Sequence, residues 1–210
     1  MTALLIASGN PHKVEEIATV LGELGLDCFG LDQLDSGFDE PEEDGATFEE
    51  NAAIKAVAYA RMTGRLCLAD DSGLEVDALD GRPGVHSARY AGVHDDLPRV
   101  DRDRLNNERL LGELDGVPSE NRSARFVCSL CLARPNGQIV EQVRGTFEGR
   151  IGEPPRVPAG SNGFGYDPLF LVAPHFERTS AELAPAEKNA MSHRGEALRR
   201  LVDRLRRHPV

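Results

Sequence analysis

Several features that would place a protein in a specialised class are scarce in this chain. Its 210 residues include 24 Lys and Arg and 35 Asp and Glu, which gives a formal net charge of −11. This charge argues against a protein whose main function is to bind the backbone of DNA or RNA. The apolar run in residues 1–7 is too short for a signal peptide or a membrane span. Neither an internal repeat nor a low-complexity tail is present. We therefore expect a globular, cytoplasmic protein with no nucleic-acid or membrane partner.

Cysteine is also scarce, and its spacing argues against a metal site. The only C-x-x-C pair, Cys128 and Cys131, lies on an expected strand, where residues three apart point to opposite faces. No second pair lies nearby to complete a zinc site. We expect both to be buried, reduced and structural.

Lysine is scarcest among the charged residues. Only Lys13, Lys55 and Lys188 are lysines, and the other basic residues are arginines. A small polyanionic ligand needs only a few well-placed cations, and a compact ammonium on a flexible stem suits contacts to phosphate. Where the three lysines lie decides whether they make such contacts, and Lys55 could equally pair with Asn51 or a nearby acid.

The apolar pattern predicts an α/β fold with a mixed sheet. The apolar or alternating runs typical of strands are 4–7, 28–31, 66–69, 125–133, 138–147 and 169–172. Helices are expected at 11–25, 47–63, 101–114 and from 192, the second starting at a Thr47–Glu50 capping box. The turn at 135–137 predicts an antiparallel hairpin, whereas residues 32–50 and 148–167 read as long loops.

The turn after the first strand is a candidate phosphate site. Ser8, Gly9 and Asn10 lead through Pro11 and His12 to Lys13 at the start of a helix, where backbone N–H groups and the helix dipole attract anions. The spacing is not that of a Walker A motif. A plain strand-to-helix connection is the alternative interpretation.

Two acidic clusters are candidates for metal binding. Mg²⁺ prefers oxygen ligands, and one or two carboxylates plus substrate phosphates can hold it. The cluster at 42–44 lies in a loop, where acids are usually just solvated. Asp70 and Asp71 follow an apolar run directly, so we expect them at the end of a buried strand, a common place for catalytic residues in α/β proteins.

Two further segments could line a ligand site. The glycines around Phe164 would allow backbone to approach a ligand, with the Phe164 ring as a flat face for a base, unless the segment is only a packed turn. Ser192 suits an N-cap. His193 and Arg194 follow it, and cations are disfavoured at a helix N-terminus unless an anionic or carbonyl-rich group offsets them, which suggests a ligand.

Taken together, these segments resemble the inosine triphosphate pyrophosphatase family, also called the Ham1-like family. The resemblance runs nearly end to end, over residues 1–210 read as a single domain. It rests on six motifs, which in chain order are Ser8 to Glu16, Thr47 to Ala56, Ala69 to Leu74, Pro83 to Gly92, Gly163 to Phe170 and Glu187 to Leu198.

The resemblance implies a Mg²⁺-dependent enzyme that hydrolyses ITP, dITP and XTP between the α and β phosphates to the monophosphate and pyrophosphate. It implies an elongated mixed sheet flanked by helices, with two lobes around a central nucleotide cleft, and a homodimer. Asp71 is the implied proton acceptor, and Glu42 and Asp71 are the implied metal residues. The implied substrate-binding residues are Ser8, Gly9, Asn10, Pro11, His12, Lys13, Ser72, Phe164, Gly165, Tyr166, Asp167, Lys188, His193 and Arg194.

Some alternatives stay open at this point. Glu43 could replace Glu42 as the metal ligand. A donor such as Arg194 or His193 would favour a 6-oxo purine over adenine, but no residue accounts for the exclusion of GTP. The chain could also be a nucleotide-binding sensor without catalysis, or a pyrophosphatase for other nucleotides.

Overall fold

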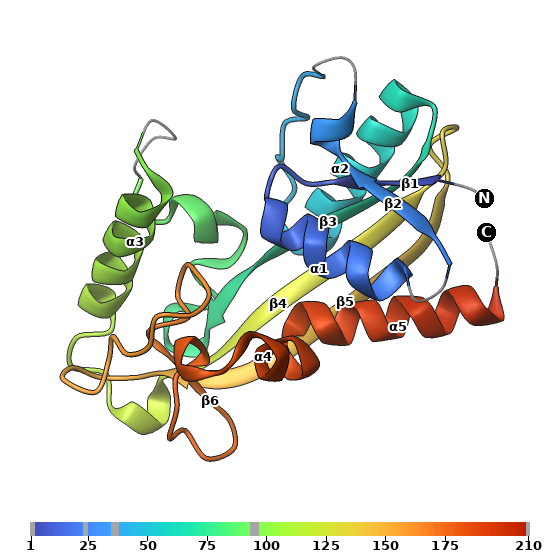
Figure 1. Cartoon of the computed structure of the whole chain (residues 1–210). Helices are drawn as coiled ribbons and strands as arrows, with labels where there is room; N and C mark the ends of the chain where they lie inside the picture. The colour runs from blue at the N-terminus through green and yellow to red at the C-terminus, as the bar shows by residue number, and fades with distance from the viewer. Residues whose placement is uncertain (1–2, 23–24, 35–37, 93–96, 209–210) are drawn as a thin grey trace. The chain divides into compact units, whose positions relative to one another are not determined.

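The computed structural model describes residues 3–22, 25–34, 38–92 and 97–208 (Figure 1). Its helices are Pro11–Gly22 (α1), Phe48–Thr63 (α2), Arg99–Glu113 (α3), Pro185–Met191 (α4) and His193–Arg207 (α5). Its strands are Ala3–Ala7 (β1), Asp27–Gly30 (β2), Leu66–Val76 (β3), Ser123–Ala133 (β4), Ile139–Ile151 (β5) and Phe170–Val172 (β6). None of the helices in these ranges is long and apolar enough to cross a membrane.

The strands form one mixed sheet in the order β2-β1-β3-β4-β5-β6. β1 pairs in parallel with β2 and β3, whereas β5 and β6 are antiparallel. The predicted α/β fold with a mixed sheet is therefore confirmed. The residues cluster in two compact units, the first made of Met1–Ser72, Cys128–Gly145 and His193–Val210, the second of Gly73–Val127 and Thr146–Ser192.

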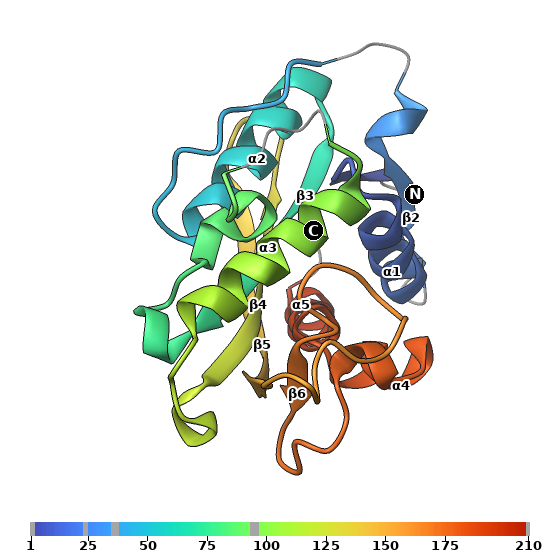
Figure 2. The ribbon, with the colours of Figure 1, turned by 90° about the vertical axis from the view of Figure 1, so that its left-hand side faces the viewer.

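The first unit buries both faces of its part of the sheet. Side chains alternate along a strand, so Leu66 and Leu68 of β3 join the core under α1 and α5, while Cys67 and Ala69 join the core under α2. Figures 1 and 2 show these helices on the two sides of β3. The same alternation separates the C-x-x-C pair on β4: Cys128 lies in the core under α1 and α5, and Cys131 lies in the core under α2. Both are free thiols, as predicted.

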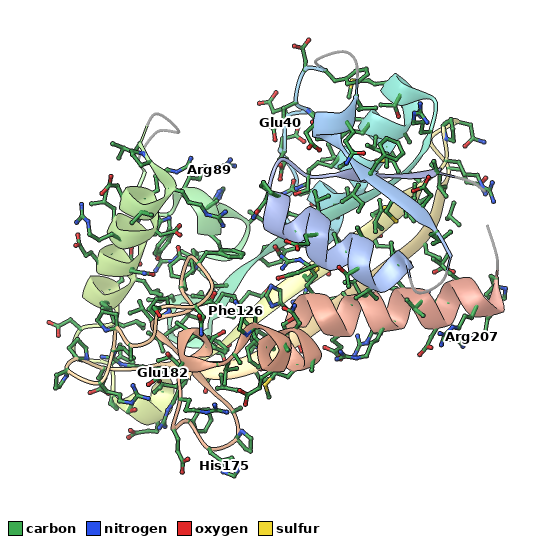
Figure 3. The ribbon with its side chains drawn as sticks, in the orientation of Figure 1. Glu40, Arg89, Phe126, His175, Glu182 and Arg207 are labelled. Atoms are coloured by element: carbon green, nitrogen blue, oxygen red, sulfur yellow. The ribbon has the colours of Figure 1, made fainter. Side chains whose placement is uncertain are left out.

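The last helix follows its sequence pattern closely. Its apolar stripe is buried in the core that it shares with α1, and its arginines at 199, 200, 204 and 206 are exposed. Figure 3 labels Arg207 at the end of this helix. The buried stripe consists of Ala197, Leu198, Leu201, Val202 and Leu205.

The second unit has an aromatic core. The ring of Phe170 in β6 lies 4.6 Å from that of Phe126 in β4 and 5.4 Å from that of Phe147 in β5, centroid to centroid. Figure 3 labels Phe126. Tyr90 and Tyr166 are buried in the same cluster. This core fixes the loop before β6, which carries the predicted Phe164 segment.

The prediction that Asp70 and Asp71 end a strand is wrong. β3 continues through both acids to Val76, so they lie in its middle. A strand can carry buried carboxylates when partners satisfy them, and both acids have cationic partners from helices. The local sequence does not contain those partners.

Smaller departures concern element boundaries. α1 ends at Gly22, and residues 23–24 of the expected helix lie outside the described part of the chain. α3 begins two residues before the expected start, and β5 runs four residues beyond the expected end. The short α4 was not expected, and Ser192 is its C-cap as well as the residue before α5.

Candidate active site

The turn from β1 into α1 has the predicted strand-to-helix form. The Ser8 hydroxyl accepts a hydrogen bond from the Asn10 N–H at 3.2 Å, and the Asn10 carbonyl accepts the first helical bond, from Val14 N, at 3.1 Å. Gly9 is exposed, and an added Cβ there would meet nothing within 4 Å. The fold itself therefore does not require a glycine at this position. Pro11 opens α1, and the side chain of His12 lies outside the described part.

A fully buried carboxylate, that of Asp70, lies at the centre of the first unit's polar residues. Its Oδ1 accepts from the Lys13 ammonium and, at 3.1 Å, from the Ser72 hydroxyl. Its Oδ2 accepts from Arg194 Nε at 3.1 Å and from the Cys128 thiol at 3.0 Å. Helix α1, strands β3 and β4 and helix α5 thus each contribute a donor, two of which are cations.

The charges around Asp70 settle its ionisation. Burial alone would raise the pKa of this carboxyl, but Lys13 and Arg194 outweigh burial and hold the pKa well below its usual range. Burial and the Asp70 charge raise the pKa of the Cys128 thiol, so the thiol stays protonated and donates. Asp70 is therefore an ionised acceptor with partners on both oxygens.

Asp71 points the other way, toward α2. Its Oδ1 lies 3.2 Å from the Lys55 ammonium, which also lies 3.1 Å from Glu43 Oε2. Its Oδ2 is buried and has no hydrogen-bond partner among the described residues. Burial raises the pKa of Asp71, the nearby Glu43 raises it further, and Lys55 opposes both.

One oxygen of Asp71, Oδ2, fits a divalent cation, although the described residues contain no cluster of three or more potential metal-binding side chains. Mg²⁺ is held by one or two carboxylates when water and substrate phosphates complete its shell. The unpartnered Asp71 Oδ2 is an acceptor of this kind. Glu43 contacts the same Lys55 ammonium that contacts Asp71 Oδ1. Glu42 is exposed, one residue further from α2.

Side chains at the start of α2 bind the end of the acidic loop, which comprises residues 38–47. The Gly45 N–H donates to Asn51 Oδ1 at 2.9 Å, and the Ala46 N–H donates to Glu50 Oε2 at 2.7 Å. Thr47 caps the helix by accepting from Glu50 N, as predicted, but the Glu50 carboxylate bonds Ala46 rather than closing the box on Thr47. These bonds fix the chain just after Glu43. Figure 3 labels Glu40 on the same loop.

In the second unit, Asp167 folds the Phe164 segment back on itself. Its Oδ2 accepts from the Phe164 N–H at 2.8 Å and from the Lys188 ammonium at 2.5 Å. Gly163 has φ +78°, and an added Cβ would lie 2.1 Å from this oxygen, so only glycine fits. Asp167 is buried, so its carboxylate serves the loop and Lys188.

The aromatic side chains of this segment differ in exposure. Tyr166 is buried and donates through its hydroxyl to the Ser87 carbonyl at 2.8 Å. Phe164 is only partly buried, and the Arg99 guanidinium carbon lies 4.3 Å from its ring centroid. The Gly165 backbone is held by Asp103 and Asn107 of α3. The Lys188 ammonium also lies 5.4 Å from the Phe164 ring centroid, so this partly exposed ring has two cationic neighbours, while Tyr166 supports the loop from inside.

The cations at the start of α5 have protein partners. Arg194 is buried and donates to Asp70, to Glu16 Oε2 at 2.8 Å and to the Ser72 hydroxyl at 3.3 Å. Two carboxylates of the chain itself, those of Asp70 and Glu16, therefore offset the charge of Arg194. His193, next to it, is also buried.

Four residues outside the implied substrate, metal and catalytic set also make contacts here: the sequence assigned no role to Glu16, whereas Asp70, Lys55 and Glu43 were only candidates. Asp70, Glu16, Lys55 and Glu43 each contact a predicted site residue or share a cation with one. A signal was present for Lys55, since it is one of only three lysines. All three lysines in fact pair with an aspartate, at Asp70, Asp71 and Asp167.

Comparison with known proteins identifies relatives over nearly the whole chain. The chain is 52% identical over 200 residues to a dITP/XTP pyrophosphatase of Nitratidesulfovibrio vulgaris, covering 95% of this chain and 94% of the relative. A solved HAM1 protein from Coxiella burnetii matches with a TM-score of 0.85 and 40% identity, covering 99% of this chain and 100% of that one.

A second solved structure, the nucleoside-triphosphatase / dITP/XTP pyrophosphatase from Mycobacterium abscessus, has a TM-score of 0.76 and 46% identity over 96% of this chain and 99% of that one. Residues 4–204 match the Ham1 family as a whole. With a family match across nearly its full length and close relatives throughout, this chain belongs to the Ham1 family.

Proposed function

We propose that this chain hydrolyses ITP, dITP and XTP to the monophosphate and pyrophosphate, and so removes deaminated purines from the nucleotide pool. The observation that carries the proposal is the Asp71 carboxylate, whose Oδ2 is buried and unpartnered among the described residues beside Lys55 and Glu43. A pure binding protein has little need for such a base. The dITP/XTP pyrophosphatase names of its relatives support the same activity.

In this proposal, Asp71 accepts the proton of the attacking water. Burial favours its neutral form, so its carboxylate is a better proton acceptor than an exposed aspartate. Mg²⁺, when bound, would neutralise phosphate oxygens and favour attack at phosphorus. We assign it to Asp71 with a glutamate of the acidic loop, either Glu42, as the family resemblance implies, or Glu43, which the contact with Lys55 supports.

The triphosphate would bind at residues 8–13. The Ser8 hydroxyl, the N–H groups at the start of α1 and the Lys13 ammonium provide donors and positive charge there. The room beside Gly9 supports close approach of a phosphate. Ser72, Lys188, His193 and the segment Phe164 to Asp167 are proposed as further contacts to the nucleotide.

Selection of the base would use a donor to the 6-oxo group. A guanidinium has five N–H groups, and Arg194 uses three of them on Asp70, Glu16 and Ser72. Donors thus remain for a purine carbonyl, which adenine lacks. His193 is the alternative donor.

The proposal is tested by incubating the chain with ITP and Mg²⁺ and measuring pyrophosphate and orthophosphate separately. We expect pyrophosphate as the direct product, with kcat/KM for ITP, dITP and XTP well above that for ATP and GTP. Parallel reactions with EDTA, Mg²⁺ or Ca²⁺ test the identity of the metal. Orthophosphate as the direct product would disprove cleavage between the α and β phosphates, and tight ITP binding without turnover would favour a sensor.

We also propose that the chain works as a homodimer in the cytoplasm, with residues 1–210 acting as one domain. Light scattering during size-exclusion chromatography measures the mass of the assembly. A mass of one chain at working concentrations would contradict the dimer.

A further inference from the structure

Asp70 is the residue on which the first unit's cations converge. Four side chains donate to its two oxygens: Lys13 and Ser72 to Oδ1, Arg194 and Cys128 to Oδ2. Its side chain is fully buried. Ser72 links the two cations a second time, since its hydroxyl also accepts from Lys13 at 2.9 Å and from Arg194 at 3.3 Å.

This arrangement is poorly suited to chemistry at Asp70 itself. Both oxygens have partners, and the side chain has no exposed surface for a water molecule or a metal ion. Because side chains alternate along β3, Asp70 faces α1 and α5 while Asp71 faces α2. The two neighbouring acids therefore have separate surroundings, and only Asp71 retains an unpartnered oxygen among the described residues.

We propose that Asp70 is a positioning residue, which orients the Lys13 ammonium and the Arg194 guanidinium together so that one carboxylate fixes both the phosphate contact and the base contact. The inference rests on the proposed function of Lys13 and Arg194 as substrate-binding residues. Both contacts are long-range, since Lys13 lies 57 residues and Arg194 lies 124 residues from Asp70 in the chain.

Asp70→Asn is the informative change, because it keeps the shape of the side chain and removes one acceptor. An amide has one accepting oxygen, so its NH₂ group must face donors on one side, either Lys13 and Ser72 or Arg194 and Cys128. At least one cation then leaves its place. A shift of about 1 Å in a positioned group can cost about 10²-fold in rate, and we expect a loss of this order in kcat/KM for ITP.

A double-mutant cycle with Lys13→Met tests whether Asp70 acts through Lys13. We expect Asp70→Asn alone to lower kcat/KM for ITP by about 10²-fold, mainly through a higher KM, and to change the ITP to ATP preference. In the Lys13→Met background the same change should cost clearly less than in the wild type, because one of the two positioned cations is already gone, while the changed ITP to ATP preference should persist through Arg194. A changed preference between substrates does not arise from a smaller fraction of folded enzyme.

Several results would overturn the proposal. Independent, multiplicative effects of the two changes would show that Asp70 does not act through Lys13. A collapse of kcat with unchanged KM would place Asp70 in the chemistry, and a lower KM would show that its charge merely opposes the anionic substrate. If the wild-type chain releases no pyrophosphate from ITP, the proposed function fails instead, before any variant is compared.

Cys128 provides a second test if Asp70→Asn does not fold. Cys128→Ala removes one donor from Asp70 Oδ2, whereas Cys128→Ser keeps a hydroxyl donor at the same place. We expect the alanine variant to raise KM for ITP by about two- to fivefold, and the serine variant to stay closer to wild type. Equal effects of the two variants, or no effect of either, would contradict a positioning role for this carboxylate.

Discussion

Asp70 and Asp71 are neighbours in the middle of β3, yet their carboxylates lie on opposite faces of the sheet and bind different lysines. Asp70 pairs with Lys13 and is ionised and saturated with donors. Asp71 pairs with Lys55, and burial shifts its pKa upward. A single strand thus holds one acid for structure and, in the proposed function, another for proton transfer.

Asp71→Asn should abolish most turnover while leaving the fold intact. Loss of a general base costs about 10²- to 10⁴-fold in rate, so we expect kcat for ITP to fall by about 10³-fold. Asp115→Asn, at an exposed acid after α3, is the matched control and should have no effect. Undiminished turnover of the Asp71 variant, with an unchanged circular dichroism spectrum, would show that another residue accepts the proton.

Glu43→Gln and Glu42→Gln should differ in metal binding. Glu43 shares the Lys55 ammonium with Asp71, whereas Glu42 is exposed, so we expect Glu43→Gln to weaken binding by about 10-fold or more and Glu42→Gln to have the smaller effect. Titration of Mn²⁺ by electron paramagnetic resonance measures this without turnover. The reverse order would assign the metal to Glu42.

Gly45→Ala should destabilise the protein by displacing the acidic loop. A Cβ at this position would lie 2.6 Å from Asn51 Oδ1 and 2.8 Å from Glu50 Cβ, and the Asn51 oxygen is the acceptor that holds the Gly45 N–H. Overpacking of this kind costs about 1–3 kcal/mol, which urea unfolding can measure.

The control for this change is Gly112→Ala in α3, where an added Cβ meets nothing within 4 Å. Alanine is favoured over glycine in a helix by about 0.5–1 kcal/mol, so this variant should be slightly more stable than wild type. Equal stability of the two alanine variants would show that the acidic loop adapts to the Cβ at position 45.

Stability should fall at alkaline pH because of the tyrosines. Burial raises the pKa of Tyr59 and Tyr166, and burial with the Glu113 contact raises the pKa of Tyr90 to about 12. The unfolded chain loses phenol protons near pH of about 10, while the folded protein retains them. The unfolded state then binds fewer protons, so the free energy of unfolding decreases as pH rises from about 10 to about 12.

Near-ultraviolet absorbance of phenolate provides the measurement, and the lack of tryptophan keeps that region clear. We expect little phenolate in the folded protein at a pH of about 10, followed by a rise that coincides with unfolding. A phenolate transition near pH 10 in protein that is still folded would contradict the shifted pKa values.

The local sequence was enough to predict most of the elements. The Thr47 cap and Gly64, which has a left-handed φ of 65°, bound α2 as expected, because capping depends on residues within one turn. The apolar stripe of α5 and the opposite faces of Cys128 and Cys131 also follow from helical and strand periodicity alone. The start of α1 at Pro11 likewise follows from the local sequence.

The sequence by itself therefore determined most of the elements and the family resemblance, and it singled out the three lysines. Only the tertiary structure decided which acid each lysine pairs with, that β3 continues through Asp70 and Asp71, and that Arg194 is offset by Asp70 and by Glu16, 178 residues away. The physical reason is that propensity and capping depend on near neighbours. The ionisation and role of a buried charge depend instead on burial and on partners that the packing of distant helices brings within a few ångströms.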